Sequence, residues 1–110
     1  MAKHWNTLKR ADLQKLFAAQ DKKFFLSRLF KVMYFVADDP HVSSIACILS
    51  RRKVKTSVKR HLCYRLWKSQ LAHHRGLTIV ICGTSQTNQA NKEELKLAIA
   101  AFFQYLETKT

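Results

Sequence analysis

The chain has 110 residues, with 20 lysines and arginines against 7 aspartates and glutamates and a formal net charge of +13. The length excludes two large domains, and a surface this positive repels itself unless a polyanion screens it. Hydrophobic residues make up 47% of the chain, with only two glycines and one proline, which excludes a disordered basic tail. We expect one folded domain over residues 1–110 whose partner is nucleic acid or an anionic membrane.

Targeting signals and cysteines indicate the compartment. No apolar run approaches the roughly 20 residues that a membrane-spanning helix needs. Residues 1–10 are polar and charged where a signal peptide has its apolar centre. Cys47, Cys63 and Cys82 are odd in number and lie among apolar neighbours, which is typical of reduced core residues. We expect an intracellular, cytoplasmic protein.

The first predicted element is a helix that Thr7 can cap and that runs to about Ala19. Leu13, Leu16 and Phe17 fall at the i, i+3, i+4 spacing of one apolar stripe. This stripe predicts that the helix packs against the rest of the domain.

Strands follow this helix. Residues 24–36 are aromatic and β-branched with partial alternation, which favours one or two strands. The sequence Asp38-Asp39-Pro40 predicts a turn. Residues 42–49 are apolar at most positions, which predicts a strand that is central in its sheet or buried on both faces.

A second helix is predicted from Ser57 to about His73, with Thr56 or Ser57 as its cap. The repeat that indicates this helix has four-residue steps at Val58, Leu62, Leu66 and Gln70. Gly76 is expected to close the helix, and the β-branched run 77–82 predicts a central strand.

The last predicted element is an amphipathic helix that ends near Glu107. The loop 83–90 before it is polar and uncharged, and Asn91 with Glu94 three positions later forms a variant of the capping box. The apolar stripe of the helix consists of Leu95, Ile99, Phe102, Phe103 and Leu106. The element order predicts an α+β fold, an αβββαβα-type sandwich with helices packed on a small mixed sheet.

Charge is distributed unevenly along the chain. Residues 40–92 contain no acidic side chain and ten lysines or arginines, nine of them between Arg51 and Arg75. A solvated helix face explains most charge runs, but such faces usually mix both signs. A region of one sign over several elements favours a site for a phosphate backbone. A membrane surface is disfavoured, because the apolar stripes are needed for the core.

Aromatic residues stand next to lysines and arginines at 22–25, 28–31 and 64–68, a pairing that proteins that bind single-stranded RNA use. Core packing nevertheless explains most of these rings. His73 and His74 with His61 or Cys63 do not have the spacing of a metal site. Catalysis by side chains needs a Cys–His pair or paired carboxylates, which the basic half of the chain does not offer. We expect no catalytic residue and no metal ligand in the protein itself.

Two segments resemble the bacterial ribonuclease P protein subunit. Residues 8–17, Leu-Lys-Arg-Ala-Asp-Leu-Gln-Lys-Leu-Phe, resemble the first helix of that family. Residues 50–62, Ser-Arg-Arg-Lys-Val-Lys-Thr-Ser-Val-Lys-Arg-His-Leu, align without gaps to its Ser-Lys-Lys turn and Arg-Asn-Arg helix. Residues 76–81 and 93–106 resemble its next strand and last helix.

The sequence departs from the family pattern at several positions. Val54 replaces the turn glycine, and Arg-Asn-Arg becomes Lys59-Arg60-His61. The Lys-Arg that often follows is Cys63-Tyr64. Positive charge is kept at two of the three signature positions.

The resemblance implies the accessory protein subunit of an RNA-based endoribonuclease, a ribonucleoprotein hydrolase that removes 5′ leaders from precursor tRNA. The catalytic RNA subunit and its Mg²⁺ would cleave the phosphodiester, and the protein alone would bind no cofactor. Its partners would be the catalytic RNA and precursor tRNA, with no DNA and no membrane. The implied RNA-binding residues are Arg51, Arg52, Lys55, Lys59, Arg60, His61 and Arg65. The implied cleft for the single-stranded leader contains Leu13 and Phe17, which can equally be core residues.

Two other functions remain open. A structural or ribosomal-type RNA-binding protein without a role in tRNA processing has the same composition and basic helix. A nuclease that uses His61, His73 or His74 as acid and base is the third possibility.

Overall fold

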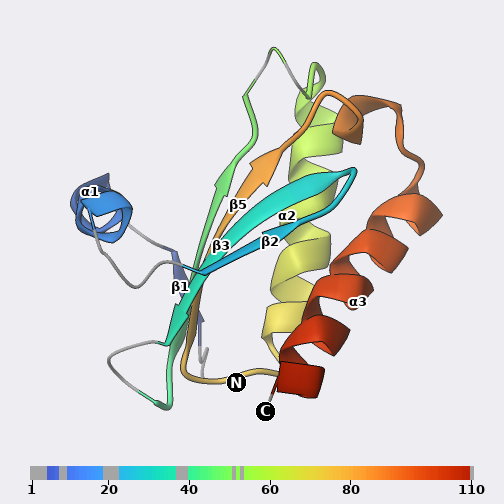
Figure 1. Cartoon of the computed structure of the whole chain (residues 1–110). Coiled ribbons are helices and arrows are strands. Elements are labelled where there is room, and N and C mark those ends of the chain that lie inside the picture. The colour runs from blue at the N-terminus through green and yellow to red at the C-terminus, as the bar shows by residue number, and fades with distance from the viewer. Residues whose placement is uncertain are drawn as a thin grey trace.

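The computed structural model describes residues 5–7, 10–18, 23–36, 40–50, 52 and 54–109. These residues form three α-helices, five strands and one short 3₁₀ helix (Figure 1). In chain order the elements are β1 (Trp5–Thr7), α1 (Arg10–Ala18), β2 (Lys23–Leu26), β3 (Phe30–Val36), β4 (Ser43–Ile48), α2 (Ser57–Leu71), β5 (Leu77–Gly83), η1 (Thr87–Gln89) and α3 (Lys92–Lys109).

The strands form one mixed sheet in the order β1-β4-β5-β3-β2. β4 pairs in parallel with both β1 and β5, while β3 is antiparallel to β5 and to β2. Val80 of β5 lies opposite Met33 on one side and Ala46 on the other, so β5 is the central strand. The prediction of central strands at 42–49 and 77–82 is confirmed.

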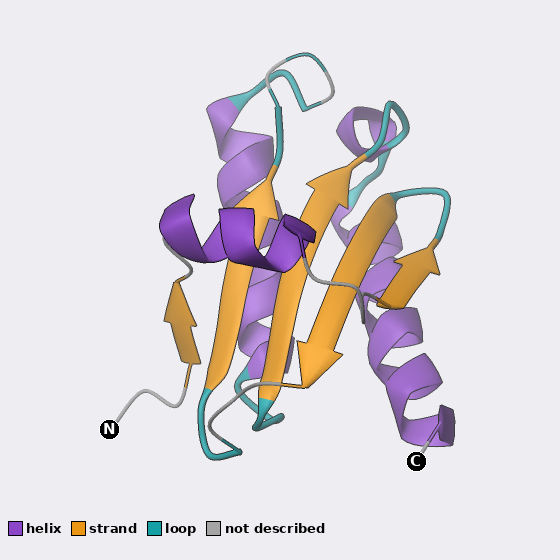
Figure 2. Cartoon of the chain, turned by 60° about the vertical axis from the view of Figure 1, so that its left-hand side comes forward, coloured by secondary structure: helices purple, strands orange, loops and turns teal. Residues whose placement is uncertain are grey.

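Helices cover both faces of the sheet. α2 and α3 lie side by side on one face, and α1 crosses the other face alone (Figures 1 and 2). Beneath α2 and α3 the core is aromatic: the indole of Trp67 is fully buried, with its centroid 5.3 Å from the ring of Phe30 and 5.6 Å from that of Phe102. This face therefore holds most of the apolar burial that stabilises the domain.

The face beneath α1 has a smaller apolar cluster. Its buried members come from the sheet, and Leu13 and Leu16 of α1 pack against them; the sheet members are Met33, Phe35, Ala46 and Val80. Because α1 is short, it covers only part of this face, and the ends of the strands beyond it stay accessible. This is the face on which exposed apolar side chains gather.

Both long helices begin at the caps that the sequence predicts. The side chain of Thr56 accepts a hydrogen bond from the backbone N–H of Lys59 at 3.2 Å. At α3, Asn91 Oδ1 accepts from the backbone N–H of Glu94 at 2.8 Å, and Glu94 Oε1 accepts from the N–H of Asn91 at 3.2 Å. The capping box is therefore reciprocal, which satisfies two backbone donors at the start of the helix.

Glu94 also links α3 to the turn between β2 and β3. Its Oε2 lies 3.1 Å from Arg28 Nη2. The backbone N–H of Asn91 and the Arg28 guanidinium lower the pKa of the Glu94 carboxyl. From the loop after β5, Thr84 Oγ1 donates to the carbonyl of Arg28 at 2.6 Å, and Thr87 Oγ1 donates to that of Leu29. The uncharged loop 83–90 is thus tied to the sheet by hydroxyl groups.

Three local predictions are wrong. Thr7 lies in β1 opposite Ile45, and α1 begins only at Arg10, so Thr7 does not directly precede the helix as predicted. The buried stripe of α2 is Cys63, Trp67 and Leu71, whereas Val58 is 78% exposed and Gln70 is exposed. The buried stripe is shifted by one residue along the sequence from the predicted one, because the large side chain of Trp67 fills the core.

The third correction concerns Gly76. Because α2 ends at Leu71 with Ala72 as its C-cap, Gly76 turns the chain into β5 and does not close the helix. Its φ of +72° is a conformation that L side chains avoid, and a Cβ there would lie 3.0 Å from the carbonyl oxygen of Pro40. The predicted turn at Asp38-Asp39 lies outside the described residues, and within the described part of the chain no helix is long and apolar enough to cross a membrane.

Candidate nucleic-acid interface

The basic segment after β4 is anchored by Val54. This side chain is fully buried, and its backbone N–H donates to the carbonyl of Ser50 at 2.8 Å. A Cβ on Gly83 would lie 3.2 Å from Val54 Cγ2, so the two residues are in close contact. No described residue other than glycine has a positive φ. The valine therefore holds this turn by packing, without a left-handed backbone.

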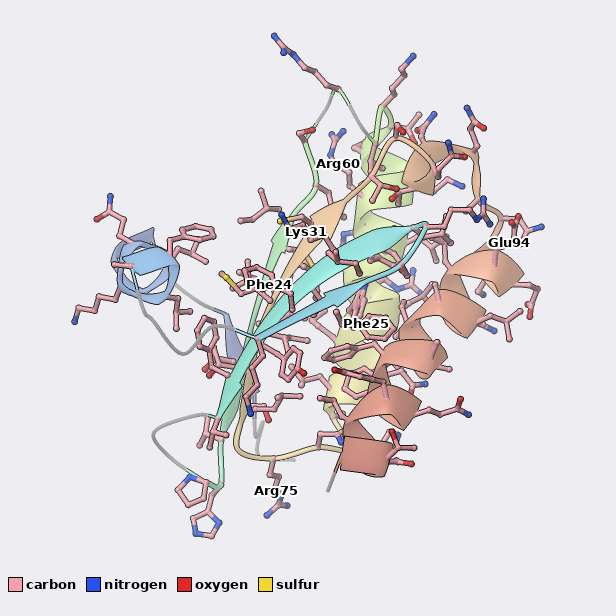
Figure 3. The ribbon with its side chains drawn as sticks, in the orientation of Figure 1. Phe24, Phe25, Lys31, Arg60, Arg75 and Glu94 are labelled. Atoms are coloured by element: carbon pink, nitrogen blue, oxygen red, sulfur yellow. The ribbon has the colours of Figure 1, made fainter. Side chains whose placement is uncertain are left out.

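Lys59 and Arg60, both predicted to contact RNA, have partners within the protein. Lys59 Nζ donates to the carbonyl of Ala90, and Arg60 Nη1 donates to that of Val54 at 2.8 Å. Both side chains are half-buried. They connect the first turn of α2 to the two loops beside it, and Figure 3 shows Arg60 at this end of the helix. The other N–H groups of the Arg60 guanidinium remain as donors.

The predicted positions that face solvent are Arg52, Lys55, His61 and Arg65, and we call these four residues the α2 basic surface. His61 and Arg65, one turn apart, line a hollow of about 510 Å³ together with Val58. His61 and Arg60 also line a second hollow of about 370 Å³ between α2 and the end of β4, with Tyr64. The structure thus brings His61 together with Arg65 in one hollow and with Arg60 in the other, whereas Arg51 lies outside the described residues.

The two predicted cleft residues of α1 have different environments. Leu13 is half-buried and packs against the cluster beneath α1. Phe17 is 47% exposed. Of the two residues, Phe17 therefore offers the more accessible surface.

A strip of accessible side chains lies on the same face of the sheet. Phe24 is 48% exposed, and Lys31 Nζ lies 5.7 Å from the centroid of its ring (Figure 3). The strand register places Lys31 opposite both Leu26 and Cys82, and Cys82 opposite Ile48. We call Phe24, Leu26, Lys31, Cys82 and Ile48 the sheet-face strip. It combines an aromatic ring and a cation, the pairing that accommodates single-stranded RNA.

Phe24 and Lys31 lie in the segments 22–25 and 28–31, where aromatic and basic residues alternate, but the sequence does not predict either residue as part of a site. The strand register supplies the missing signal: in the pairs Phe24–Met33 and Leu26–Lys31 the residues lie directly opposite each other and so share one face. Without the register, a strand with aromatic residues on both sides does not reveal which ring is exposed. Phe25, the neighbour of Phe24, points to the opposite face and packs its ring 5.5 Å from that of Phe102 (Figure 3).

The candidate nuclease histidines are not brought together. His61 lies in the first turns of α2 and His73 after its end, roughly 18 Å apart along the helix axis. The ring of His74 stacks on Phe103 at 4.5 Å. Burial raises the pKa of Cys47 to about 12 and that of Cys63 to about 11, so these thiols stay protonated at neutral pH. Among the described residues, no three His, Cys, Asp or Glu side chains gather as a metal site.

Comparison with known proteins identifies the fold. No family model and no curated protein sequence matches the chain. Among solved structures, the RNase P protein of Staphylococcus aureus matches with a TM-score of 0.72 and 13% identity over 96% of both chains. The chain has the fold of bacterial RNase P proteins. A mutant of the S. aureus protein, described as defective in mRNA degradation activity, matches with a TM-score of 0.75 at 12% identity, covering 93% of this chain and 87% of that one.

A second bacterium provides the same match. The RNase P protein of Thermotoga maritima, solved in complex with 1-(4-fluorophenyl)-2-thiourea, aligns with a TM-score of 0.67 and 13% identity, covering 84% of this chain and 92% of that chain. The predicted α+β class and the resemblance to RNase P proteins are thus confirmed. At such low identity the agreement concerns the RNase P protein fold, and the roles of individual side chains have to be argued from this chain.

Proposed function

We propose that this chain is the protein subunit of ribonuclease P, which binds the catalytic RNA and the 5′ leader of precursor tRNA and so assists 5′ maturation. One observation carries the proposal: within the RNase P protein fold, the segment from the end of β4 through α2 to the start of β5 contains nine lysines and arginines and no acid. Such a segment attracts closely spaced phosphates, because each neutralised phosphate releases condensed counterions.

The α2 basic surface is the proposed contact for the catalytic RNA. Arg52, Lys55 and Arg65 are exposed cations, and His61 between them can donate or accept a hydrogen bond. Arginine is suited to this role, because its planar guanidinium can contact two phosphate oxygens at once. Lys59 and Arg60 contribute charge to the same region while they hold its loops in place.

The leader is proposed to lie on the sheet-face strip, beside α1. The exposed rings of Phe17 and Phe24 offer surfaces on which unpaired bases stack, and Lys31 offers a cation for the phosphate between them. Stacking of this kind tolerates any base sequence, as a leader that varies between transcripts requires. Leu13 supports this site from below, by packing α1 onto the sheet.

In this proposal the protein performs no bond cleavage. The RNA and its Mg²⁺ ions, which the RNA holds, supply the reaction, and the protein increases the affinity for substrate and neutralises phosphate repulsion. Bound protein cations therefore replace part of the diffuse Mg²⁺ that the RNA otherwise needs. The largest stimulation is expected at low Mg²⁺.

The test is cleavage of a precursor tRNA leader at low Mg²⁺, with a bacterial RNase P RNA alone, with the RNA plus this protein, and with the protein alone. We expect stimulation only in the mixture. The double variant Arg52→Ala/Arg65→Ala should lose most of it, whereas Lys92→Ala/Lys96→Ala, which removes the same charge from exposed positions of α3, should keep it. RNA binding without stimulation would indicate a structural RNA-binding protein, and cleavage by the protein alone would indicate a nuclease.

A further inference from the structure

A third hollow lies at the opposite end of the domain from the start of α2. It has a volume of about 820 Å³ and lies between the C-terminal part of α3 and the ends of β2, β3 and β5. Among the residues that line it are Lys23, Tyr34, His74, Arg75 and Tyr105, and we call it the α3-end hollow. Figure 3 shows Arg75 at this end and Arg60 at the other. The 15-residue α2 separates the two ends by roughly 22 Å.

The interior of this hollow is aromatic and apolar. The hydroxyl groups of Tyr34 and Tyr105 lie 3.5 Å apart, and their ring centroids are separated by 6.4 Å. Val36, Leu77 and Leu106 add aliphatic surface. Burial and the neighbouring Tyr105 raise the pKa of Tyr34 to about 12, so its phenol remains a neutral hydrogen-bonding group. Such a lining suits a flat, uncharged ring with polar edges.

The rim of the hollow is cationic. Lys23 and Arg75 are exposed and belong to different elements, the start of β2 and the turn before β5. Burial lowers the pKa of His74, and Glu107 at the end of α3 acts on it in the opposite direction. The described lining thus has two exposed basic side chains, Lys23 and Arg75, and contains no acidic one. An anionic group is therefore favoured at the mouth, and a flat ring is favoured inside.

We propose that the α3-end hollow binds one unpaired nucleotide of an RNA, with the base against the tyrosines and the phosphate between Lys23 and Arg75. The volume lies within the roughly 300 to 1,000 Å³ of pockets that bind small ligands. The charge at the rim selects the phosphate, and the aromatic interior selects the base. This site is separate from the α2 basic surface and meets the sheet-face strip at Phe24, which lines the hollow as well, so it adds a further point of contact with RNA.

The experiment uses the full chain and adenosine 5′-monophosphate as probe, with adenosine and inorganic phosphate as separate arms. We expect saturable NMR amide shifts at Tyr34, Arg75 and Tyr105, with AMP binding more tightly than either arm. Lys23→Ala/Arg75→Ala should weaken AMP binding about tenfold and lower the slope of log K against log salt, because it removes two cations from the phosphate. Lys92→Ala/Lys96→Ala, at exposed positions outside the proposed sites, should leave AMP binding unchanged.

Three results would overturn the proposal. Shifts confined to the α2 basic surface, or to Leu26, Lys31, Cys82 and Ile48 of the sheet-face strip, would place the nucleotide elsewhere. Phosphate that binds as tightly as AMP would reduce the hollow to an anion site. An equal loss in the control Lys92→Ala/Lys96→Ala, which carries the same charge change at exposed positions, would show net charge alone to be responsible. Because the titration contains no precursor tRNA, its outcome does not depend on the ribonuclease P assay.

Discussion

The clearest prediction concerns two pairs of basic residues on and beside α2. All four are predicted from the sequence to contact RNA, but in the structure Lys59 and Arg60 are half-buried and Arg52 and Arg65 are exposed. Lys59 and Arg60 are half-buried and donate to the carbonyls of Ala90 and Val54. Hydrogen bonds to charged groups contribute about 1.5 to 3 kcal/mol when fully formed and buried, and partial exposure reduces this to about 1 kcal/mol each. We therefore expect Lys59→Met/Arg60→Met to lower the free energy of unfolding by about 2 kcal/mol.

The exposed pair should behave in the opposite way. Arg52 and Arg65 are exposed, and we expect Arg52→Ala/Arg65→Ala to change the free energy of unfolding by less than about 0.5 kcal/mol. If each arginine contacts one phosphate, the slope of log K against log salt should become shallower by about 1.4 to 1.8, at roughly 0.7 to 0.9 per contact. Binding should therefore weaken most at low salt, where counterion release is most favourable.

Two measurements on the same protein samples check this separation. Urea denaturation gives the free energy of unfolding. Fluorescence anisotropy with a labelled RNase P RNA fragment at about 50 to 300 mM salt gives the slope. The Lys92→Ala/Lys96→Ala variant controls for net charge. An unchanged slope in Arg52→Ala/Arg65→Ala would remove the α2 basic surface from the interface. Unchanged stability in Lys59→Met/Arg60→Met would refute the bracing role of these two residues.

Three further predictions concern the fold. Trp67→Ala should lower the free energy of unfolding by about 3 to 5 kcal/mol in urea, because it empties the centre of the aromatic core. Gly76→Ala should cost about 1 to 2 kcal/mol in the same assay, because its φ is +72° and Pro40 leaves no room for a Cβ; a neutral result would contradict this geometry. The pKa of Glu94 is lowered in the folded state, so its contribution to stability is present above its ordinary pKa of 4.5 and is lost as the pH falls through the lower folded-state value. Glu94→Gln should therefore flatten the acid side of the stability–pH curve, measured by thermal unfolding.

Local signals predicted most of the fold. The cap pair Asn91–Glu94 and the stripe behind it define α3 without reference to the rest of the chain, because capping and amphipathicity act within a few residues. The β-branched run at 77–82 is long enough only for a strand, and the structure makes it the central one. These elements are determined by interactions between near neighbours in the sequence.

Elements that depend on distant partners were missed or misplaced. The sequence alone favours Thr7 as a helix cap. Only the fold shows that Thr7 belongs to β1 and pairs with Ile45 of β4. The buried side of α2 was assigned from Leu62 and Leu66, whose regular spacing is real but which only flank the core. Cys63 and Trp67 take the buried positions because the cavity between the sheet and α3 fits a large ring. Periodicity predicts that a helix has a buried face, and the neighbouring elements decide which one.

For the candidate site, too, some features follow from the sequence alone and others only from the fold. The absence of acids from 40–92 located the basic region from sequence alone, because electrostatic attraction to a polyanion is long-ranged and needs no knowledge of contacts. The structure was needed to show which cations are exposed, since Lys59 and Arg65 both lie on the same predicted basic helix and only the fold makes one half-buried and the other exposed. Phe24 and Lys31 needed the register of β2 against β3.

The departures from the family motif have a common physical consequence. Val54 fills the space beside Gly83 with a side chain, which gives the basic turn an apolar anchor, and its carbonyl provides the acceptor that holds Arg60. A cation held in this way contributes its field but loses part of its freedom to follow a phosphate. In the proposed complex, RNA contact then depends more strongly on the exposed residues of the α2 basic surface. Val54→Gly should lower the free energy of unfolding in urea, because it removes the buried side chain beside Gly83. The backbone carbonyl that accepts from Arg60 is kept, so Arg60 gains freedom only as far as the turn itself loosens.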